Sequence, residues 1–94
     1  MSTQPQRLHA VVHGRVQGVS FRYYTLQRAN ELGLVGWVSN RYDRTVELVA
    51  EGPRPALDKL VAFLWQGPLA ATVTDVDISW MVATGQYDHF EITG

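Results

Sequence analysis

Cysteine is absent from the 94 residues of the chain. Its absence excludes disulfide bonds, thiolate metal sites, iron–sulfur clusters and a cysteine nucleophile. Because small secreted domains commonly depend on disulfides, a chain without them is more typical of the cytoplasm. Long apolar runs are also missing, so no segment reaches the length of a membrane-spanning helix. Residues 1–6 are polar and lack the apolar stretch of a signal peptide. We therefore expect a cytoplasmic protein that does not bind membranes.

An excess of basic charge is missing as well, since eight Lys and Arg residues stand against nine Asp and Glu residues. Domains that bind nucleic acids usually carry a basic excess, so a formal net charge of −1 argues against that class. The hydrophobic content of 46% is ordinary for a soluble globular protein. The length allows one domain with a single core. We expect residues 1–6 to form a flexible segment and residues 7–94 to form the domain.

Hydrophobic periodicity predicts five strands and two helices. The segments with strand-like alternation or frequent Val and Trp are residues 7–13, 34–40, 45–51, 73–82 and 87–93. The segments with apolar residues at helical spacing are residues 21–32 and 55–66. This order is that of the ferredoxin-like α+β class with one strand added. We expect a βαββαβ sandwich, in which both helices cover one face of a largely antiparallel sheet of four to five strands.

Individual residues refine these expectations. Ser20 precedes the first helix and is expected to cap it, its hydroxyl accepting a hydrogen bond from an amide of the first turn. Gly33 fits the left-handed position that follows a helix end. In the strand over residues 45–51, Glu47 and Glu51 alternate with the apolar residues and are expected to face outward.

The segment between the first strand and the first helix carries the clearest chemical signal. It reads Gly14-Arg15-Val16-Gln17-Gly18-Val19-Ser20-Phe21-Arg22. A helix N-terminus presents unpaired N–H groups and the positive end of the helix dipole, and both favour an anion. The glycines allow successive amides to converge on one point, and an arginine in the first turn can pair with two phosphate oxygens. The segment is neither a nucleotide P-loop nor a dinucleotide fingerprint. From the residues alone, a phosphate site and a solvent-exposed arginine both remain open.

Residues 14–22 closely resemble the first signature of the acylphosphatase family. The resemblance continues through Ala29, Leu32-Gly33-Leu34, Gly36-Trp37-Val38-Ser39-Asn40, Asp43, Val46-Glu47, Glu51-Gly52, Gly67-Pro68 and Ala71-Thr72-Val73. The spacing between Arg22 and Asn40 also agrees, so the match covers nearly the whole chain after Gln6. We therefore expect the chain to be a member of this family.

The resemblance implies hydrolysis of acyl phosphates to a carboxylate and inorganic phosphate, without metal, cofactor or covalent phosphoenzyme. Arg22 is similar to the catalytic arginine that holds the phosphoryl group, and Asn40 to the catalytic asparagine that orients the attacking water. The loop that resembles the phosphate cradle consists of Arg15, Val16, Gln17, Gly18 and Val19. The implied partners are a small acyl phosphate and inorganic phosphate, the latter as product or inhibitor. We expect no nucleic-acid partner, and a monomer.

One residue departs from the family pattern beside the expected site. Arg44 stands where the family commonly has glycine in the turn between the second and third strands. If that position needs a positive φ, an arginine costs about 1 kcal/mol or changes the turn type. We expect this departure to affect the hairpin and not the chemistry.

Two other functions use the same fold class. RNA-recognition modules have the same order of strands and helices, but they need aromatic and basic residues on the open sheet face. Glu47 and Glu51, expected on that face, would repel a phosphate backbone. A regulatory domain that binds a small molecule is the second alternative. Fold alone does not decide among these functions.

Overall fold

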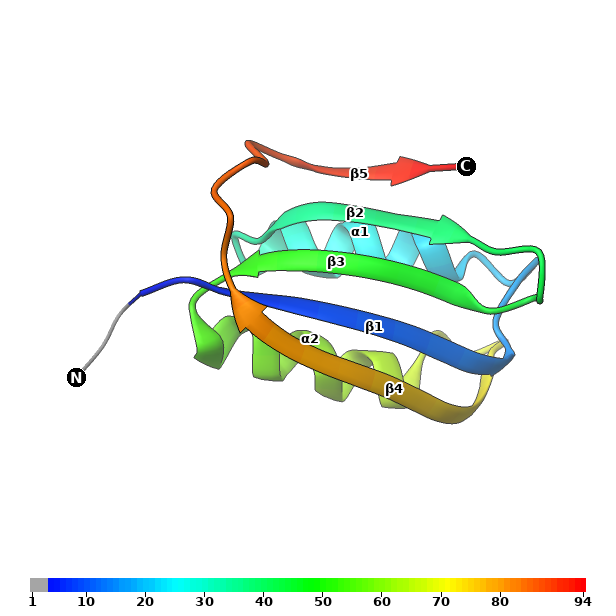
Figure 1. The fold of residues 1–94 in the computed structure, drawn as a ribbon. Helices are drawn as coiled ribbons and strands as arrows, with labels where there is room; N and C mark the ends of the chain where they lie inside the picture. The colour runs from blue at the N-terminus through cyan, green and yellow to red at the C-terminus, as the bar shows by residue number, and fades with distance from the viewer. Residues whose placement is uncertain (1–3) are drawn as a thin grey trace.

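The computed structural model describes residues 4–94. The chain forms one five-stranded sheet with the strand order β4-β1-β3-β2-β5 (Figure 1). Neighbouring strands are antiparallel except for β5, which runs parallel to β2. The ferredoxin-like order predicted from the sequence is confirmed, with β5 as the added strand. The elements are β1 (Gln6–Arg15), α1 (Phe21–Glu31), β2 (Val35–Asn40), β3 (Val46–Gly52), α2 (Arg54–Gln66), β4 (Thr72–Val82) and β5 (Phe90–Thr93).

The bounds differ from the predicted ones mainly in β1 and β5. Gln6 pairs with Gly52 and Val82, so it belongs to β1 and not to a flexible segment; residues 1–3 lie outside the described residues. At its other end β1 continues to Arg15, through a register shift after His13 where the sequence predicted a break. Gly14 lies in this bulge with φ 120°, where an added Cβ would collide with the carbonyl oxygen of Thr72, so the bulge requires a glycine.

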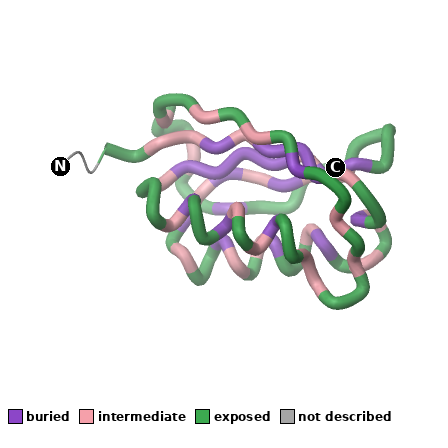
Figure 2. The backbone as a smooth tube through the Cα atoms, turned by 90° about the horizontal axis from the view of Figure 1, so that it is seen from below, coloured by how far each residue is buried: buried purple, intermediate pink, exposed green. Residues whose placement is uncertain are grey.

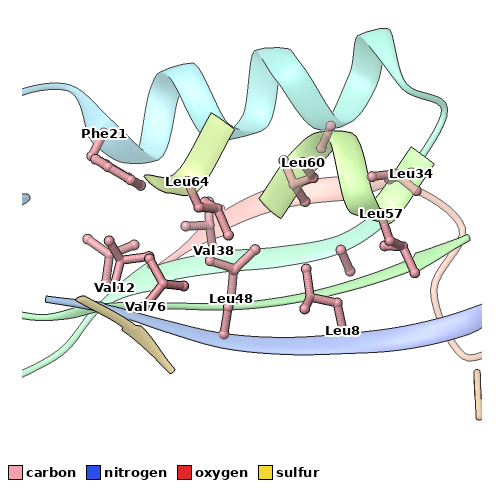
Figure 3. Packing of buried hydrophobic residues seen from close by; sticks show 14 of the residues in the cluster. Leu8, Val12, Phe21, Leu34, Val38, Leu48, Leu57, Leu60, Leu64 and Val76 are labelled. Atoms are coloured by element: carbon pink, nitrogen blue, oxygen red, sulfur yellow. The ribbon is translucent and has the colours of Figure 1, made fainter. Parts of the chain in front are cut away.

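The core lies between the sheet and its two helices. Figure 2 shows buried backbone along the strands and exposed backbone on the outer turns of the helices. In Figure 3, Phe21 of α1 and Leu64 of α2 point towards Val12 and Val76 of the sheet. The alternation predicted for the strands is confirmed, since their core-facing side chains are fully buried: Leu8, Ala10, Val12, Val38, Val46, Leu48 and Ala50. This packing fixes both ends of α1 relative to the strands.

The end of α1 agrees with the sequence. Gly33 adopts φ 70°. Leu34 is buried, and its backbone N–H donates to the carbonyl of Ala29 at 2.9 Å, which satisfies a carbonyl of the last turn.

Glu51 does not face solvent as predicted: only 3% of it is exposed. The segment that leads from β4 to β5 crosses one end of the open sheet face, where Thr84 and Gly85 contact Glu51 (Figure 1). The Glu51 carboxylate accepts hydrogen bonds from Arg7 Nε at 2.9 Å, from the N–H and hydroxyl of Thr84 at 2.9 Å, and from the N–H of Gly85 at 3.0 Å. Burial would raise the pKa of Glu51, but the hydrogen bonds from Thr84, Gly85 and Arg7 outweigh it and hold that pKa below its ordinary value.

Tyr87 is held by the same face and not by a strand. Its hydroxyl accepts hydrogen bonds from Arg7 Nη2 at 3.0 Å and from Trp37 Nε1 at 3.1 Å. This explains why β5 begins at Phe90 and not at Tyr87, where the sequence predicted it. The crossing segment therefore sets where β5 lies against β2.

We expect Glu51→Gln to lower the free energy of unfolding by about 2–4 kcal/mol at pH 7, because it leaves Arg7 without its charge partner and removes an acceptor from buried donors. Urea denaturation measures the change. Glu47→Gln is the matched control on the same strand face: its half-buried pair with His9 predicts a loss below about 1 kcal/mol. Equal losses in the two variants would contradict the role of Glu51.

The stability lost in Glu51→Gln should depend on pH, and it should decrease as the pH falls. Because the folded-state pKa of Glu51 lies below its ordinary value of 4.5, the unfolded chain binds more protons in this range. The stabilisation is complete above that value and is lost as the pH falls through the folded-state pKa. The difference between the wild type and Glu51→Gln should therefore shrink below pH 4.5.

Candidate active site

Four segments meet at one end of the sheet. They are the β1–α1 connection, the β2–β3 turn, the α2–β4 connection and the end of β5, which lie at the right of Figure 1. A hollow of about 380 Å³ lies among the β1–α1 connection, the start of α1, the end of β2 and β5. It is lined by Val16, Gly18, Ser20, Phe21, Arg22, Tyr23, Asn40 and Ile92.

The β1–α1 connection is packed into the core at its start and exposed at its end. Val16 is buried in the core, which holds the loop against the sheet. Gly18 then adopts φ 74°, a conformation that a glycine reaches without a steric cost. Ser20 adopts φ 62°, and this left-handed conformation costs a residue with a side chain about 1 kcal/mol. Strained residues of this kind gather at functional sites.

Ser20 does not cap α1 as predicted. It occupies the N-cap position, but its side chain makes no capping hydrogen bond. The physical reason is its backbone, because a capping side chain needs the extended conformation and Ser20 is left-handed. The amides at the start of α1 are consequently left for another acceptor.

Three amides of the loop have no hydrogen-bond partner among residues 4–94. The first backbone hydrogen bond of α1 runs from the N–H of Tyr24 to the carbonyl of Ser20 at 3.1 Å. Within residues 4–94, no hydrogen bond occupies the N–H groups of Val16, Gly18 or Val19. Free amides at the positive end of a helix dipole favour an anion.

Arg22 lies in the first turn of α1 and lines the hollow. Its one hydrogen bond within residues 4–94 runs from Nη1 to the carbonyl oxygen of Gly94 and is long, at 3.4 Å. The guanidinium therefore keeps most of its five N–H donors for a ligand.

The surroundings of the hollow are positively charged. The loop over residues 14–22 and the turn over residues 40–45 together carry four arginines and one carboxylate, that of Asp43. A chain with a formal net charge of −1 thus concentrates half of its eight basic residues in two segments that meet at one hollow. Such a local excess attracts anions.

Asn40 is the last residue of β2 and lines the hollow. It pairs with Val46 of β3. Its side-chain oxygen is buried and meets no donor in the part of the chain that the structure describes. A buried acceptor without a partner costs about 1–3 kcal/mol in the ligand-free protein.

The turn that follows Asn40 is ordered by its own polar residues. Asp43 accepts hydrogen bonds from the side chain and the backbone N–H of Thr45, and these hold the pKa of Asp43 below its ordinary value. Arg44 adopts φ 69°, so this turn does require the positive φ that a glycine would supply. The hairpin forms with the arginine in place, and Asn40 keeps its pairing in β2.

Gln17 joins the loop to this turn. Its side-chain amide donates to the carbonyl of Arg41 at 2.8 Å and to that of Thr45 at 2.9 Å. The phosphate-type loop and the strand end that bears Asn40 are thereby held at a fixed separation. The sequence predicts a role for the backbone of Gln17 but not for its side chain, because the two acceptors lie 24 and 28 residues away.

The structure brings most of the predicted residues to one place. Val16, Gly18, Arg22 and Asn40 line the same hollow, whereas Arg15 and Val19 line a hollow beside it. Tyr23 and Ile92 also line this hollow, and the sequence did not predict either of them. No local motif marks Ile92, because it is brought to the hollow by the pairing of β5 with β2, in which it lies beside Val38.

Across residues 4–94, no three His, Asp or Glu side chains are grouped so that they could hold a metal ion. No helix in this part of the chain is long and apolar enough to cross a membrane.

Comparisons with known proteins identify the family of the chain. A sequence model of the acylphosphatase family matches residues 8–92. An acylphosphatase of Pelotomaculum thermopropionicum is 50% identical over 86 residues, which cover 92% of this chain and 94% of that relative. An acylphosphatase of Chloroflexus aurantiacus is 48% identical over the same length and similar coverage. The crystal structure of acylphosphatase from Bacillus subtilis has a TM-score of 0.91 and 37% identity, covering 95% of this chain and 99% of that one. The chain therefore belongs to the acylphosphatase family.

Proposed function

We propose that this protein hydrolyses acyl phosphates at the hollow between the β1–α1 loop and Asn40. The phosphoryl group binds to Arg22 and to the backbone amides of residues 15–19, and Asn40 positions the attacking water. The observation that carries the proposal is the meeting of unpaired loop amides, a free guanidinium and an unsatisfied amide oxygen at one hollow. Membership of the acylphosphatase family supplies the reaction.

The chemistry asks little of the protein. An acyl phosphate releases a carboxylate, whose conjugate acid has a pKa of about 4, so no strong general acid is needed. The transition state of phosphoryl transfer is loose and carries its charge on the outer oxygens of phosphorus. Donors that are fixed before the reaction stabilise this charge without reorganisation. The amides of the loop and the fork of Arg22 are donors of this kind.

Water supplies the nucleophile. Its oxygen forms a bond to phosphorus while the bond between phosphorus and the acyl oxygen breaks, and the electron pair leaves with the carboxylate. The amide of Asn40 orients the water, since its oxygen accepts and its nitrogen donates a hydrogen bond. An amide is not a base near neutral pH, so a phosphate oxygen takes the proton of the water. The products are the carboxylate and inorganic phosphate.

The setting of this reaction follows from the sequence. We place the protein in the cytoplasm, because it lacks cysteine and a membrane-spanning helix was not found in residues 4–94. Its substrate is a small molecule, and the protein acts as a monomer. Inorganic phosphate, which has the charge and shape of the transferred group, inhibits competitively.

The direct test is release of inorganic phosphate from acetyl phosphate with EDTA present. We expect turnover far above the uncatalysed rate, unchanged by the chelator, and competitive inhibition by added phosphate. Absence of turnover would refute the hydrolase assignment. If the same preparation retained RNA in an electrophoretic assay at low salt, the RNA-binding alternative would replace it.

A further inference from the structure

A second hollow of about 630 Å³ adjoins the one that holds Arg22. The two share Gly18 and Ser20, so a ligand can extend from one into the other without leaving the surface. The second hollow is lined by Arg15, Gly18, Val19, Ser20, Tyr24, Pro68, Leu69 and Ala70.

The wall of this second hollow comes from the turn after α2. Gly67 packs so closely against α1 that an added Cβ would lie 3.1 Å from Cε2 of Phe21. The turn closes with a hydrogen bond from the N–H of Ala71 to the carbonyl of Pro68 at 2.9 Å. Leu69, at its tip, is fully exposed, and 43% of Tyr24 is exposed. These two large side chains therefore present apolar surface beside the phosphate-type site.

The direction of attack indicates that the acyl group occupies this second hollow and not the one beside Asn40. This step rests on the proposed function. Attack and departure lie in line through phosphorus, so the acyl group leaves on the side away from the water. A hollow on the other side of the site is lined by Asn40 itself, together with Tyr42 and Gly94. Because Asn40 holds the water, that hollow belongs to the nucleophile. The hollow of Tyr24 and Leu69 does not include Asn40 and lies on the side of the leaving group.

A third hollow, next to Arg44, also touches the loop but has a different character. It is lined by Gly14, Arg15, Val16, Gln17 and Arg44. The one apolar side chain among them larger than glycine is Val16, which is buried. It can hold water or an anion but offers little surface to an apolar group.

We propose that Tyr24 and Leu69 form an acyl-binding subsite that favours acyl phosphates with apolar, planar acyl groups. A benzoyl group placed there buries one face on the ring of Tyr24 and an edge on Leu69, and both contacts remove apolar surface from water. Arg15 also lines this hollow, so its guanidinium is available to stack on the other face of the ring. An acetyl group is too small to reach both side chains, so it gains less.

The test compares kcat/KM for benzoyl phosphate and acetyl phosphate in the wild type, Leu69→Ala and Tyr24→Ala. Both side chains are exposed, and alanine is favourable in a helix, so the variants should fold. We expect each variant to lose about five- to tenfold in kcat/KM for benzoyl phosphate, mostly through KM, and at most about twofold for acetyl phosphate. The selectivity ratio therefore falls towards unity.

Tyr42→Ala is the matched control, because Tyr42 is a fully exposed aromatic residue on the side of Asn40. We expect it to leave the ratio unchanged. A ratio that falls in Tyr42→Ala and not in the other two variants would place the acyl group on the wrong side and overturn the proposal. A ratio unaffected by all three would overturn it too, while acetyl phosphate turnover would leave the proposed function standing. If the wild type hydrolyses neither substrate, the proposed function itself fails.

Discussion

Arg22→Ala is expected to lower kcat/KM for acetyl phosphate by about a thousandfold. The guanidinium is the one side chain of the hollow that can donate two parallel hydrogen bonds to a phosphoryl group, and it carries a full positive charge. Loss of a single preorganised donor to a developing charge typically costs a hundred- to a thousandfold, and loss of an arginine on a transferring phosphoryl group costs about a thousandfold or more. Steady-state phosphate release measures the change.

Two variants sharpen this prediction. Arg22→Lys keeps the charge but loses the fork, so it should recover only a small part of the activity. Arg28→Ala is the matched control in the last turn of the same helix, where Arg28 pairs with Glu31 at 3.5 Å and not with the hollow; it should be as active as the wild type. Near-normal kcat/KM in Arg22→Ala would remove Arg22 from the site.

Stability separates a catalytic loss from a folding defect. A positive charge in the first turn opposes the helix dipole by about 0.3–1 kcal/mol. The one hydrogen bond that the Arg22 side chain makes within residues 4–94 is long, at 3.4 Å, and its loss should cost little stability. Arg22→Ala should therefore unfold at the same urea concentration as the wild type or at a higher one.

The fold was largely predictable because its signals are local. Apolar residues alternate in β1 and β3 and recur at helical spacing in α2, and each pattern names the face that the core then buries. The order of elements is compatible with few topologies, and one of these is observed. The predicted start of β5 was wrong because of contacts between residues that are distant in the sequence. Tyr87 lies outside β5, since its hydroxyl accepts hydrogen bonds from Arg7 and Trp37.

The candidate site was predictable where a motif lies in one segment. Arg22 and the loop glycines stand within nine residues, and Asn40 ends a strand whose limits the sequence gives closely. Gln17 shows the limit of such reasoning, since its side chain bonds to a turn that is distant in the sequence. Ser20 shows another limit: its residue type favours a cap, but the loop forces it into a conformation that prevents capping.

The open sheet face bears on the RNA-binding alternative. Glu51 is not the exposed charge that the sequence predicts, because it is buried and paired with Arg7. What disfavours RNA is instead the crossing segment, whose Tyr87 hydroxyl accepts a hydrogen bond from the indole of Trp37. An aromatic residue held in this way offers less free surface for a base to stack on.

Asn40→Ala is expected to lower kcat for acetyl phosphate by about a hundred- to a thousandfold while changing KM little. In the proposed mechanism Asn40 orients the water and does not hold the phosphoryl group, so its removal should affect the transition state more than substrate binding. This split between kcat and KM distinguishes it from Arg22→Ala, in which both parameters should suffer. Ser39→Ala, one residue earlier on the other strand face, should retain kcat within about threefold, because Ser39 bonds only to the carbonyl of Asn40.

Stability should move in the opposite direction to activity in Asn40→Ala. The side-chain oxygen of Asn40 is buried without a donor among residues 4–94, and its removal relieves a cost of about 1–3 kcal/mol in the ligand-free protein. Urea denaturation should therefore show the variant to be at least as stable as the wild type. A variant that is both inactive and clearly destabilised would mean that Asn40 supports the hairpin; one that is stable and fully active would remove it from catalysis. A buried amide oxygen without a donor contributes nothing to the stability of the fold, which supports the water-positioning role that we propose for Asn40.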